Sequence, residues 1–361
     1  MFIFILILQS CKNQDAVNNG GAPVVNLDPG NRELSHENVM EIIDWVEIKA
    51  DSSLFIGNAS KVEAFGSEYY IMDDRNQKCI LRYTSEGKLK NKIGRYGDGP
   101  GEYSTIIDFS IDEANSRIFI LSGESSIYIY STDGVFERKV RLADDIISKV
   151  SCNPKGLMAS SGYSSMKIKT DGFLLSEFDD NFKTIGQWIQ FTEPMRPPFV
   201  PFGADCLVTH GDRTYYFDDI NLNVVVYDCN SNKLDSLMSF SMNNRMPREI
   251  FNDNMRFITE QTKYNWVKDF VMTDSNVIVG YIYGGNYSIT ITDRMGNIVT
   301  SGIYHGPFPQ CYAEEDDTII SPVPVDIYLN YWENQSGIIK PASDITEDTN
   351  LLIMRWKLKK Y

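Results

Sequence analysis

The feature that most constrains this chain is an internal repeat of about 48 residues. Stretches of alternating apolar residues end in an aromatic side chain, and a turn rich in Gly, Asn or Asp follows each of them. The residues that end these stretches are Tyr83, Tyr130, Phe178 and Tyr227, which stand 47, 48 and 49 positions apart. Two further copies end at Thr292 and Trp356. Alternation with a period of two predicts β-strands, so the chain repeats one β-unit six times.

Each repeat has room for about four strands. In the second repeat we predict them at 106–111, 117–122, 127–132 and 135–142. Four short antiparallel strands recurring every 40–50 residues are typical of a β-propeller blade. The six copies therefore predict an all-β, six-bladed β-propeller with four-stranded antiparallel blades. The sixth copy lacks an outer strand, so we predict that the N-terminal strand at Trp45–Lys49 pairs with the C-terminal blade and closes the ring.

The first residues indicate an export signal. Residues 1–8 form an apolar run that is too short to span a bilayer, and Gln9, Ser10 and Cys11 follow it. This end resembles a bacterial lipobox, whose cysteine carries lipid. We predict a lipoprotein signal peptide at 1–10, a tether at 11–40, a propeller at 41–361, and lipid on Cys11 that anchors the chain to the outer membrane of a bacterial envelope. The alternative is a hydrophobic segment with a chance cysteine.

Two motifs resemble those of a known family. The segment Lys92–Tyr103, with the sequence KIGRYGDGPGEY, and the C-terminal segment Asp348–Lys359 are similar to the glycine signature and closing strand of the six-bladed β-propeller lipoproteins of Bacteroidetes, which are themselves similar to NHL-repeat propellers. The family's usual Asn-Pro is Asn350-Leu351 here. The resemblance spans roughly 40–360. It implies the fold and an envelope location, but no catalytic residues.

The composition argues against several functions. A net charge of −15 disfavours a nucleic-acid partner, because phosphate binding needs a basic face. The chain has only 3 histidines and lacks zinc-ligand spacings, hydrolase and metalloprotease motifs and EF-hand spacing, so we predict no metal, no cofactor and no catalytic residue. Apart from Cys11 the cysteines are odd in number, which favours buried free thiols, with a Cys206–Cys229 bridge as the alternative.

The candidate binding face is the one that carries the connections between blades, because long loops in a compact domain usually serve function. Long insertions are predicted there at 193–202, 242–265 and 305–321. In the second of them, Ile250, Phe251, Met255 and Ile258 have the spacing of one apolar helix face. Aromatic rings suit sugar and peptide ligands, so the candidate ligand-binding residues from these insertions and their borders are Phe199, Phe202, Tyr264, Trp266, Phe308 and Tyr312.

The glycine-rich segment Gly97–Gly101 lacks the spacing of a phosphate loop and predicts a turn between blades one and two. Its neighbours Asp98, Glu102 and Tyr103 are further candidates for ligand binding. The acidic run 314–317 is predicted beside the same face, so a polyanionic ligand is disfavoured there.

These observations favour a non-catalytic envelope protein that binds a glycan, a peptide or a protein partner through the face with the connections between blades. One alternative is a hydrolase or lyase that acts on polysaccharides, because two carboxylates could supply such chemistry. Another is a structural subunit of an outer-membrane complex. The oligomeric state is not predicted.

Overall fold

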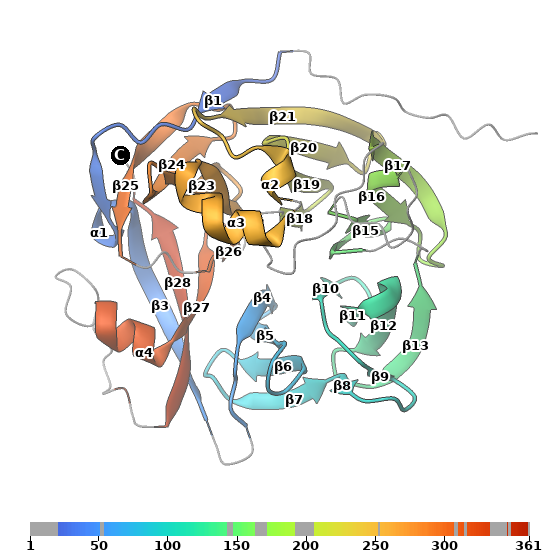
Figure 1. Cartoon of the computed structure of the whole chain (residues 1–361). Coiled ribbons are helices and arrows are strands. Elements are labelled where there is room, and N and C mark those ends of the chain that lie inside the picture. Colours follow the sequence, from blue (N-terminus) through green and yellow to red (C-terminus); the bar gives the residue numbers. More distant parts are fainter. Residues whose placement is uncertain are drawn as a thin grey trace, which may run out of the picture.

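The computed structural model describes residues 21–50, 54–142, 147–162, 172–191, 206–251, 253–306, 310–313, 316–332, 345 and 348–359. Six sheets stand around a central axis like the blades of a propeller (Figure 1). Within each blade four consecutive positions are antiparallel, and the innermost strand lines the axis. The predicted six-bladed β-propeller with four-stranded antiparallel blades is thereby confirmed.

The first three blades are continuous in sequence. Blade one consists of β4 (Ala59–Phe65), β5 (Glu68–Asp73), β6 (Cys79–Thr84) and β7 (Leu89–Ile93). Blade two consists of β10 (Asp108–Asp112), β11 (Arg117–Ser122), β12 (Ser126–Ser131) and β13 (Phe136–Arg141), with the short helix η1 (Gly123–Ser125) between its second and third strands. Blade three consists of β14 (Lys149–Asn153), β15 (Gly156–Ser160), β16 (Gly172–Phe178) and β17 (Thr184–Phe191).

The last three blades carry additions. Blade four consists of β18 (Cys206–His210), β19 (Arg213–Asp218), β20 (Asn223–Asp228) and β21 (Lys233–Ser241). Blade five consists of β22 (Trp266–Met272), β23 (Asn276–Tyr283), β24 (Asn286–Asp293) and β25 (Ile298–His305). Blade six consists of β26 (Tyr312–Ala313), β27 (Ile319–Pro324), β28 (Thr349–Leu358) and β3 (Met40–Lys49), with α4 (Val325–Ile327) and η3 (Tyr328–Trp332) between β27 and β28.

The repeat in the sequence corresponds to the third strand of every blade. Tyr83, Tyr130, Phe178, Tyr227, Thr292 and Trp356 all lie at or near the ends of these strands, and all are buried. Each pair of neighbouring blades encloses one apolar cluster, so the blades are apolar on both faces. Burial on both faces explains why the repeat is strong in the sequence, since each blade must present apolar residues to two neighbours.

The chain closes the ring with its own N-terminal region. β3 is the outer strand of blade six and pairs antiparallel with β28, so that Trp45 stands opposite Met354 and Ile48 opposite Leu351. Trp45–Lys49 was assigned to this position from the sequence. The observed strand is longer and begins at Met40.

Residues 21–40, which the sequence analysis placed in a tether, form part of the folded ring. β1 (Val24–Asn26) adds a fifth strand parallel to β21, and β2 (Glu33–Ser35) adds one parallel to β25, before α1 (His36–Val39) leads into β3. Val25, Leu27 and Leu34 are buried in the clusters between blades four, five and six. These isolated apolar residues among polar ones resemble a tether in sequence, and only the neighbouring blades give them something to pack on.

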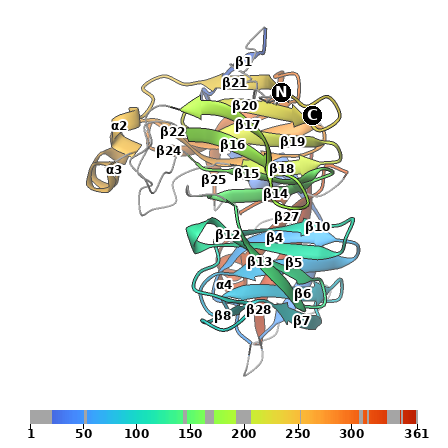
Figure 2. The ribbon, with the colours of Figure 1, turned by 90° about the vertical axis from the view of Figure 1, so that its right-hand side faces the viewer.

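The two ends of the propeller axis are different. The connections between blades lie at one end, together with α2 (Arg248–Phe251), α3 (Asn254–Glu260) and η2 (Gln261–Lys263), which project from that end in Figure 2. The turns between the first and second strand of each blade lie at the other end. We call the corresponding ends of the central channel the crossover mouth and the turn mouth.

The predicted helix in the insertion 242–265 exists, but its predicted apolar face is wrong in part. The helix is broken after Phe251, and Asp253 caps the start of α3 by accepting the backbone N–H of Arg256. The break changes the helical phase, so Met255 and Ile258 are 69% and 55% exposed. The prediction holds for Ile250, which is buried, and Phe257 takes the place of Met255 and Ile258; Ile250 and Phe257 pack with Met246 and Trp266.

Candidate functional site

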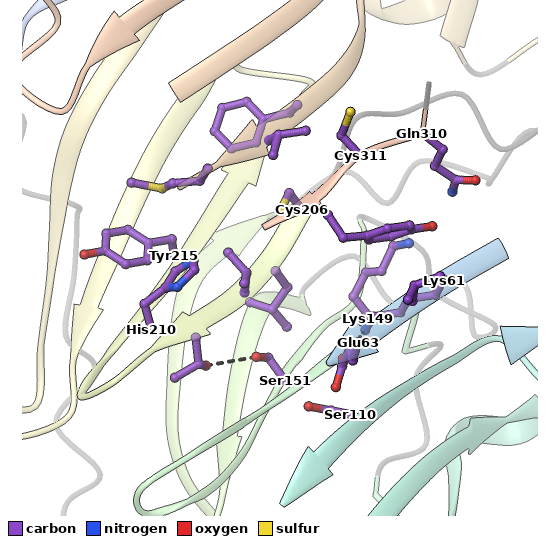
Figure 3. A pocket seen from close by; sticks show the side chains of 18 of the residues that line it. Lys61, Glu63, Ser110, Lys149, Ser151, Cys206, His210, Tyr215, Gln310 and Cys311 are labelled. Carbon is purple, nitrogen blue, oxygen red and sulfur yellow. Dashed lines mark hydrogen bonds and ion pairs between the residues drawn. The ribbon is translucent and has the colours of Figure 1, made fainter. Parts of the chain in front are cut away.

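A channel of about 2320 Å³ runs along the propeller axis. The inner strands of all six blades contribute to its wall. Figure 3 shows side chains from several blades directed toward this space, among them Lys61, Lys149, His210 and Gln310. A concave space lined by a mixture of polar and apolar groups is the usual form of a ligand site.

A partly buried ion cluster forms the channel wall between blades one and two. The Lys61 ammonium lies 2.8 Å from Asp108 Oδ1 and 3.0 Å from Glu63 Oε1, and it also donates to the carbonyl of Phe109 at 2.6 Å. Burial alone would lower the pKa of Lys61, but the two carboxylates outweigh it and raise that pKa above its ordinary value. Burial also raises the pKa of Glu63, against the opposing effect of Lys61.

Each carboxylate of this cluster also binds a backbone N–H of a neighbouring blade. Glu63 Oε2 accepts from Ile111 at 3.1 Å, and Asp108 Oδ2 accepts from Val150 at 2.9 Å. The cluster therefore connects the inner strands of three consecutive blades. Because every one of these four oxygens has a donor, the cluster is a structural clamp in the channel wall.

The sequence analysis did not identify Lys61, Glu63 or Asp108. In a strand, residues two apart point to the same side, so Lys61 and Glu63 were the only local signal of a charged channel wall. Their partner Asp108 is 47 residues away. That separation equals one repeat. A comparison of equivalent positions in successive repeats would therefore have paired Lys61 with Asp108.

The turn mouth carries a second polar network. His210 Nδ1 lies 3.6 Å from Asp274 Oδ1, and Arg294 donates to the Tyr215 hydroxyl at 2.5 Å. The acidic run lies at this end, because Asp316 and Asp317 follow β26 in the turn to β27. The placement of this run beside the crossover face was therefore wrong, since the inner strand of blade six begins at Tyr312, before the run.

The Asp-Asp pairs at 73–74 and 218–219 lie at turns. Asp73 is fully buried and accepts the backbone N–H groups of Gly57, Arg75, Asn76 and Gln77. Asp218 accepts those of Ile220 and Asn221. These carboxylates fix the turns after the second strands.

Two of the predicted aromatic residues line the channel at the crossover mouth. Trp266 opens β22 and packs edge-on against Phe257 of α3, with ring centroids 5.4 Å apart. Tyr312 lies on β26, and its hydroxyl donates to the carbonyl of Ser60 in blade one at 2.5 Å. Tyr264 lies nearby but packs against the apolar cluster under α2 and α3. Phe199, Phe202 and Phe308, like Cys11, lie outside the described residues.

The glycine-rich segment is held together by its own hydrogen bonds and by packing. The short strands β8 (Arg95–Tyr96) and β9 (Glu102–Tyr103) pair in parallel around it. Glu102 is bound by Arg95 and by the backbone N–H of Gly99, and Tyr103 is buried with its hydroxyl donating to the Lys78 carbonyl at 3.0 Å. Of the three candidates here only Asp98 is exposed.

Gly101 shows why this segment needs glycine. Its φ is +74°, and a Cβ at this position would stand 2.6 Å from the Phe136 ring. The turn therefore joins blades one and two by close packing, as the structural interpretation of the sequence predicted.

The five cysteines in the described part of the chain are free thiols. Cys206 begins an inner strand at the crossover end, whereas Cys229 follows a third strand at the opposite end, so the alternative bridge does not form. Within the described residues no group of three or more His, Cys, Asp or Glu side chains is arranged to hold a metal ion. None of the helices described there is long and apolar enough to cross a bilayer.

Six four-stranded blades around an accessible channel define the class of protein as a β-propeller with a central channel lined by polar and apolar residues. Within this class, the chain belongs to the family described as "Domain of unknown function (DUF4934)", whose model matches residues 23–357. The match includes the strands β1 and β2 that precede the ring-closing strand.

Two solved structures from Bacteroides share this fold. A protein of Bacteroides fragilis NCTC 9343 that is described as an exported protein superposes with a TM-score of 0.72 at 16% identity, covering 93% of this chain and 100% of that one. A member of the DUF4221 family from Bacteroides vulgatus ATCC 8482 superposes with a TM-score of 0.57 at 10% identity, covering 90% and 100%. No curated protein matches the chain. At these identities the similarity shows the fold alone.

Proposed function

We propose that this chain is an envelope-anchored, non-catalytic binding protein that takes a glycan, a peptide or a protein partner at the crossover mouth of its channel. The observation that carries the proposal is the composition of that mouth, where Trp266 and Tyr312 lie beside Lys149, Thr262 and Gln310 from different blades. Aromatic area with a few convergent polar groups is what a specific ligand site requires.

The ion cluster in the channel wall favours binding over hydrolysis. A two-carboxylate mechanism needs one carboxyl group that protonates the leaving group and another that is free to attack or to activate water. Both oxygens of Glu63 and both of Asp108 already accept from Lys61 or from backbone N–H groups. The alternative of a polysaccharide hydrolase or lyase would need a different pair.

A bulky side chain at each end of the channel tests which mouth receives the ligand. Thr262 and Ala114 are both exposed and line the channel, the first at the crossover mouth and the second at the turn mouth. We expect Thr262→Trp to weaken binding to glycan and peptide arrays at least tenfold by steric exclusion, and Ala114→Trp to leave it unchanged. The opposite pattern would place the site at the turn mouth.

The proposed anchor is lipid on Cys11, supported by the lipobox-like sequence, by the resemblance to propeller lipoproteins and by a structural relative that is described as exported. We expect Cys11→Ala to abolish incorporation of labelled palmitate and to move the protein from the membrane fraction to the supernatant. Ser10→Ala, which keeps the sulfur, should leave both unchanged. Membrane retention of Cys11→Ala together with an unlabelled wild type would contradict the lipoprotein proposal.

A further inference from the structure

The channel wall around blade six is irregular on both sides. In β22 the register shifts between Val267 and Asp269, so Lys268 is an extra residue without a partner on β23. In β4 the register shifts between Ala59 and Lys61, which leaves Ser60 as the extra residue. Between them stands β26, which has 2 residues. Bulges that flank a site commonly redirect side chains toward it, so we define the bulge sector as Ser60, Lys61, Lys268, Asp269, Gln310 and Tyr312.

The bulge at Lys268 places a carboxylate in the channel wall. Asp269 lines the channel, and its Oδ2 accepts the Tyr287 hydroxyl at 2.9 Å. Gly280 stands opposite Asp269 on β23, and a Cβ there would lie 2.1 Å from the Tyr287 oxygen. The glycine thus leaves the room that Tyr287 needs to reach Asp269. Burial raises the pKa of Asp269, while Tyr287 and Lys268 oppose that shift.

The sector is continuous across three blades. Asp269 of blade five and Cys311, which directly precedes Tyr312 of blade six, both line the channel. Gln310 and Tyr312, on either side of Cys311, both donate to the carbonyl of Ser60, at 3.0 and 2.5 Å. Ser60 adjoins Lys61 of the ion cluster. A ligand in the bulge sector would therefore meet the Asp269 carboxylate, the Lys268 ammonium, the Gln310 amide and the Tyr312 ring.

We propose that the bulge sector binds a neutral saccharide unit, with Asp269 accepting hydrogen bonds from its hydroxyl groups and Tyr287 holding that carboxylate in position. This inference rests on the proposed binding function and names its ligand class. Hydroxyl groups both donate and accept, so they can use Asp269 and Lys268 together. An anionic sugar group at this position would be repelled by the Asp269 carboxylate, which lines the channel there. The ammonium group of a basic peptide at Asp269 would be repelled by the positive charge of the adjacent Lys268.

The test uses the full chain on a glycan array that carries neutral, uronic and sulfated oligosaccharides, and on an array of basic peptides, followed by calorimetry with the strongest neutral oligosaccharide. We expect neutral oligosaccharides to bind. Asp269→Asn should weaken that binding roughly 10- to 100-fold, because a hydrogen bond to a charged acceptor is lost. The matched control is Asp235→Asn on the exposed face of β21, which should leave binding unchanged. Circular dichroism and thermal unfolding establish that each variant is folded.

Tyr287→Phe tests the positioning role. Without the hydroxyl the pKa of Asp269 rises, so the loss of affinity on acidification should begin at a higher pH than in the wild type. The groups that face Asp269 are Tyr287, Lys268 and Cys311, and the shift should vanish in the double variant that also carries Asp269→Asn.

The outcomes separate this inference from the proposed function. Neutral binding that Thr262→Trp removes but Asp269→Asn leaves intact would overturn the role of Asp269 and keep the crossover mouth. Exclusive binding of basic peptides or anionic glycans, sensitive to Thr262→Trp, would overturn the saccharide class and keep the binding function. Binding that only Ala114→Trp removes, or no binding on either array, would overturn both.

Discussion

A variant that lacks residues 1–49 should be unfolded at room temperature, and it should show no cooperative unfolding transition on heating. It loses β3, which leaves the long edge of β28 unpaired, and it loses the buried side chains of Met40, Ile42 and Ile48. At about 1.5–3 kcal/mol for each buried apolar side chain, the loss is comparable to the whole stability of a domain, about 5–15 kcal/mol. Thermal unfolding followed by circular dichroism and calorimetry provides the measurement.

Two shorter deletions serve as controls. Removing residues 1–20 should leave the melting temperature unchanged, because among the described residues β1 is the first element that packs on the ring. Removing residues 1–38 should give an intermediate loss, since the segment with β1 and β2 carries the buried Val25, Leu27 and Leu34, but these strands are additions to blades that are already complete. Equal melting temperatures for the deletions of 1–38 and 1–49 would contradict closure by β3.

Lys61→Met should destabilise the protein by about 3–5 kcal/mol at neutral pH, because it leaves the buried Asp108 and the partly buried Glu63 without their cation. Methionine fills a similar volume, so the loss is electrostatic. Lys233→Met on the exposed edge of β21 is the matched control and should change stability by less than about 0.5 kcal/mol. Urea unfolding at fixed pH measures both variants.

The pH dependence distinguishes this mechanism from a loss of packing. The folded-state pKa of Glu63 is already raised by burial, and without Lys61 it rises further. A carboxyl group whose folded pKa exceeds its unfolded pKa destabilises the fold above that folded pKa, and the penalty decreases as the pH falls toward the unfolded value. The deficit of Lys61→Met should therefore shrink as the pH falls from neutral toward the ordinary pKa of a glutamate. A constant deficit over that range would show that packing, not charge, was lost.

In the wild type, Lys61 stabilises the fold in its charged form, whereas burial makes the charged form of Glu63 unfavourable. The carboxylates raise the pKa of Lys61 in the folded state despite its burial. Its stabilising contribution is therefore present up to the unfolded-state pKa of a lysine and is lost only as the pH rises through the higher folded-state value.

Local sequence patterns were sufficient to predict the propeller fold and the number of its blades. Each blade is buried on both faces, so its third strand must alternate or run apolar up to a buried anchor, and Tyr83, Tyr130 and Tyr227 mark that strand at a constant interval. The turn-forming roles of Gly101 and Asp73 were also predictable, because a positive φ or a carboxylate at a turn is a property of a few neighbouring residues. The placement of Trp266 and Tyr312 at a channel mouth followed from the same repeat.

Other features depended on residues far apart in the chain. The break between α2 and α3 redirects Met255 and Ile258 to solvent, and a helical spacing rule cannot register it because the rule assumes one continuous helix. The acidic run was predicted at the wrong end of the channel. The reason is that β26 begins at Tyr312, before the run, and a strand of 2 residues leaves almost no periodic signal in the sequence. β1 and β2 are ordered only because blades four and five offer their outer edges.

The sequence by itself determined the class of fold and the six blades, because both follow from a period that is repeated along the chain. The tertiary structure alone decided the chemistry of the channel. Lys61 meets Asp108 across a blade boundary, and Asp269 meets Tyr287 through the space left at Gly280. The physical reason is that a charged or polar group is placed by partners one or more strands away, whereas an apolar face is specified by its own neighbours.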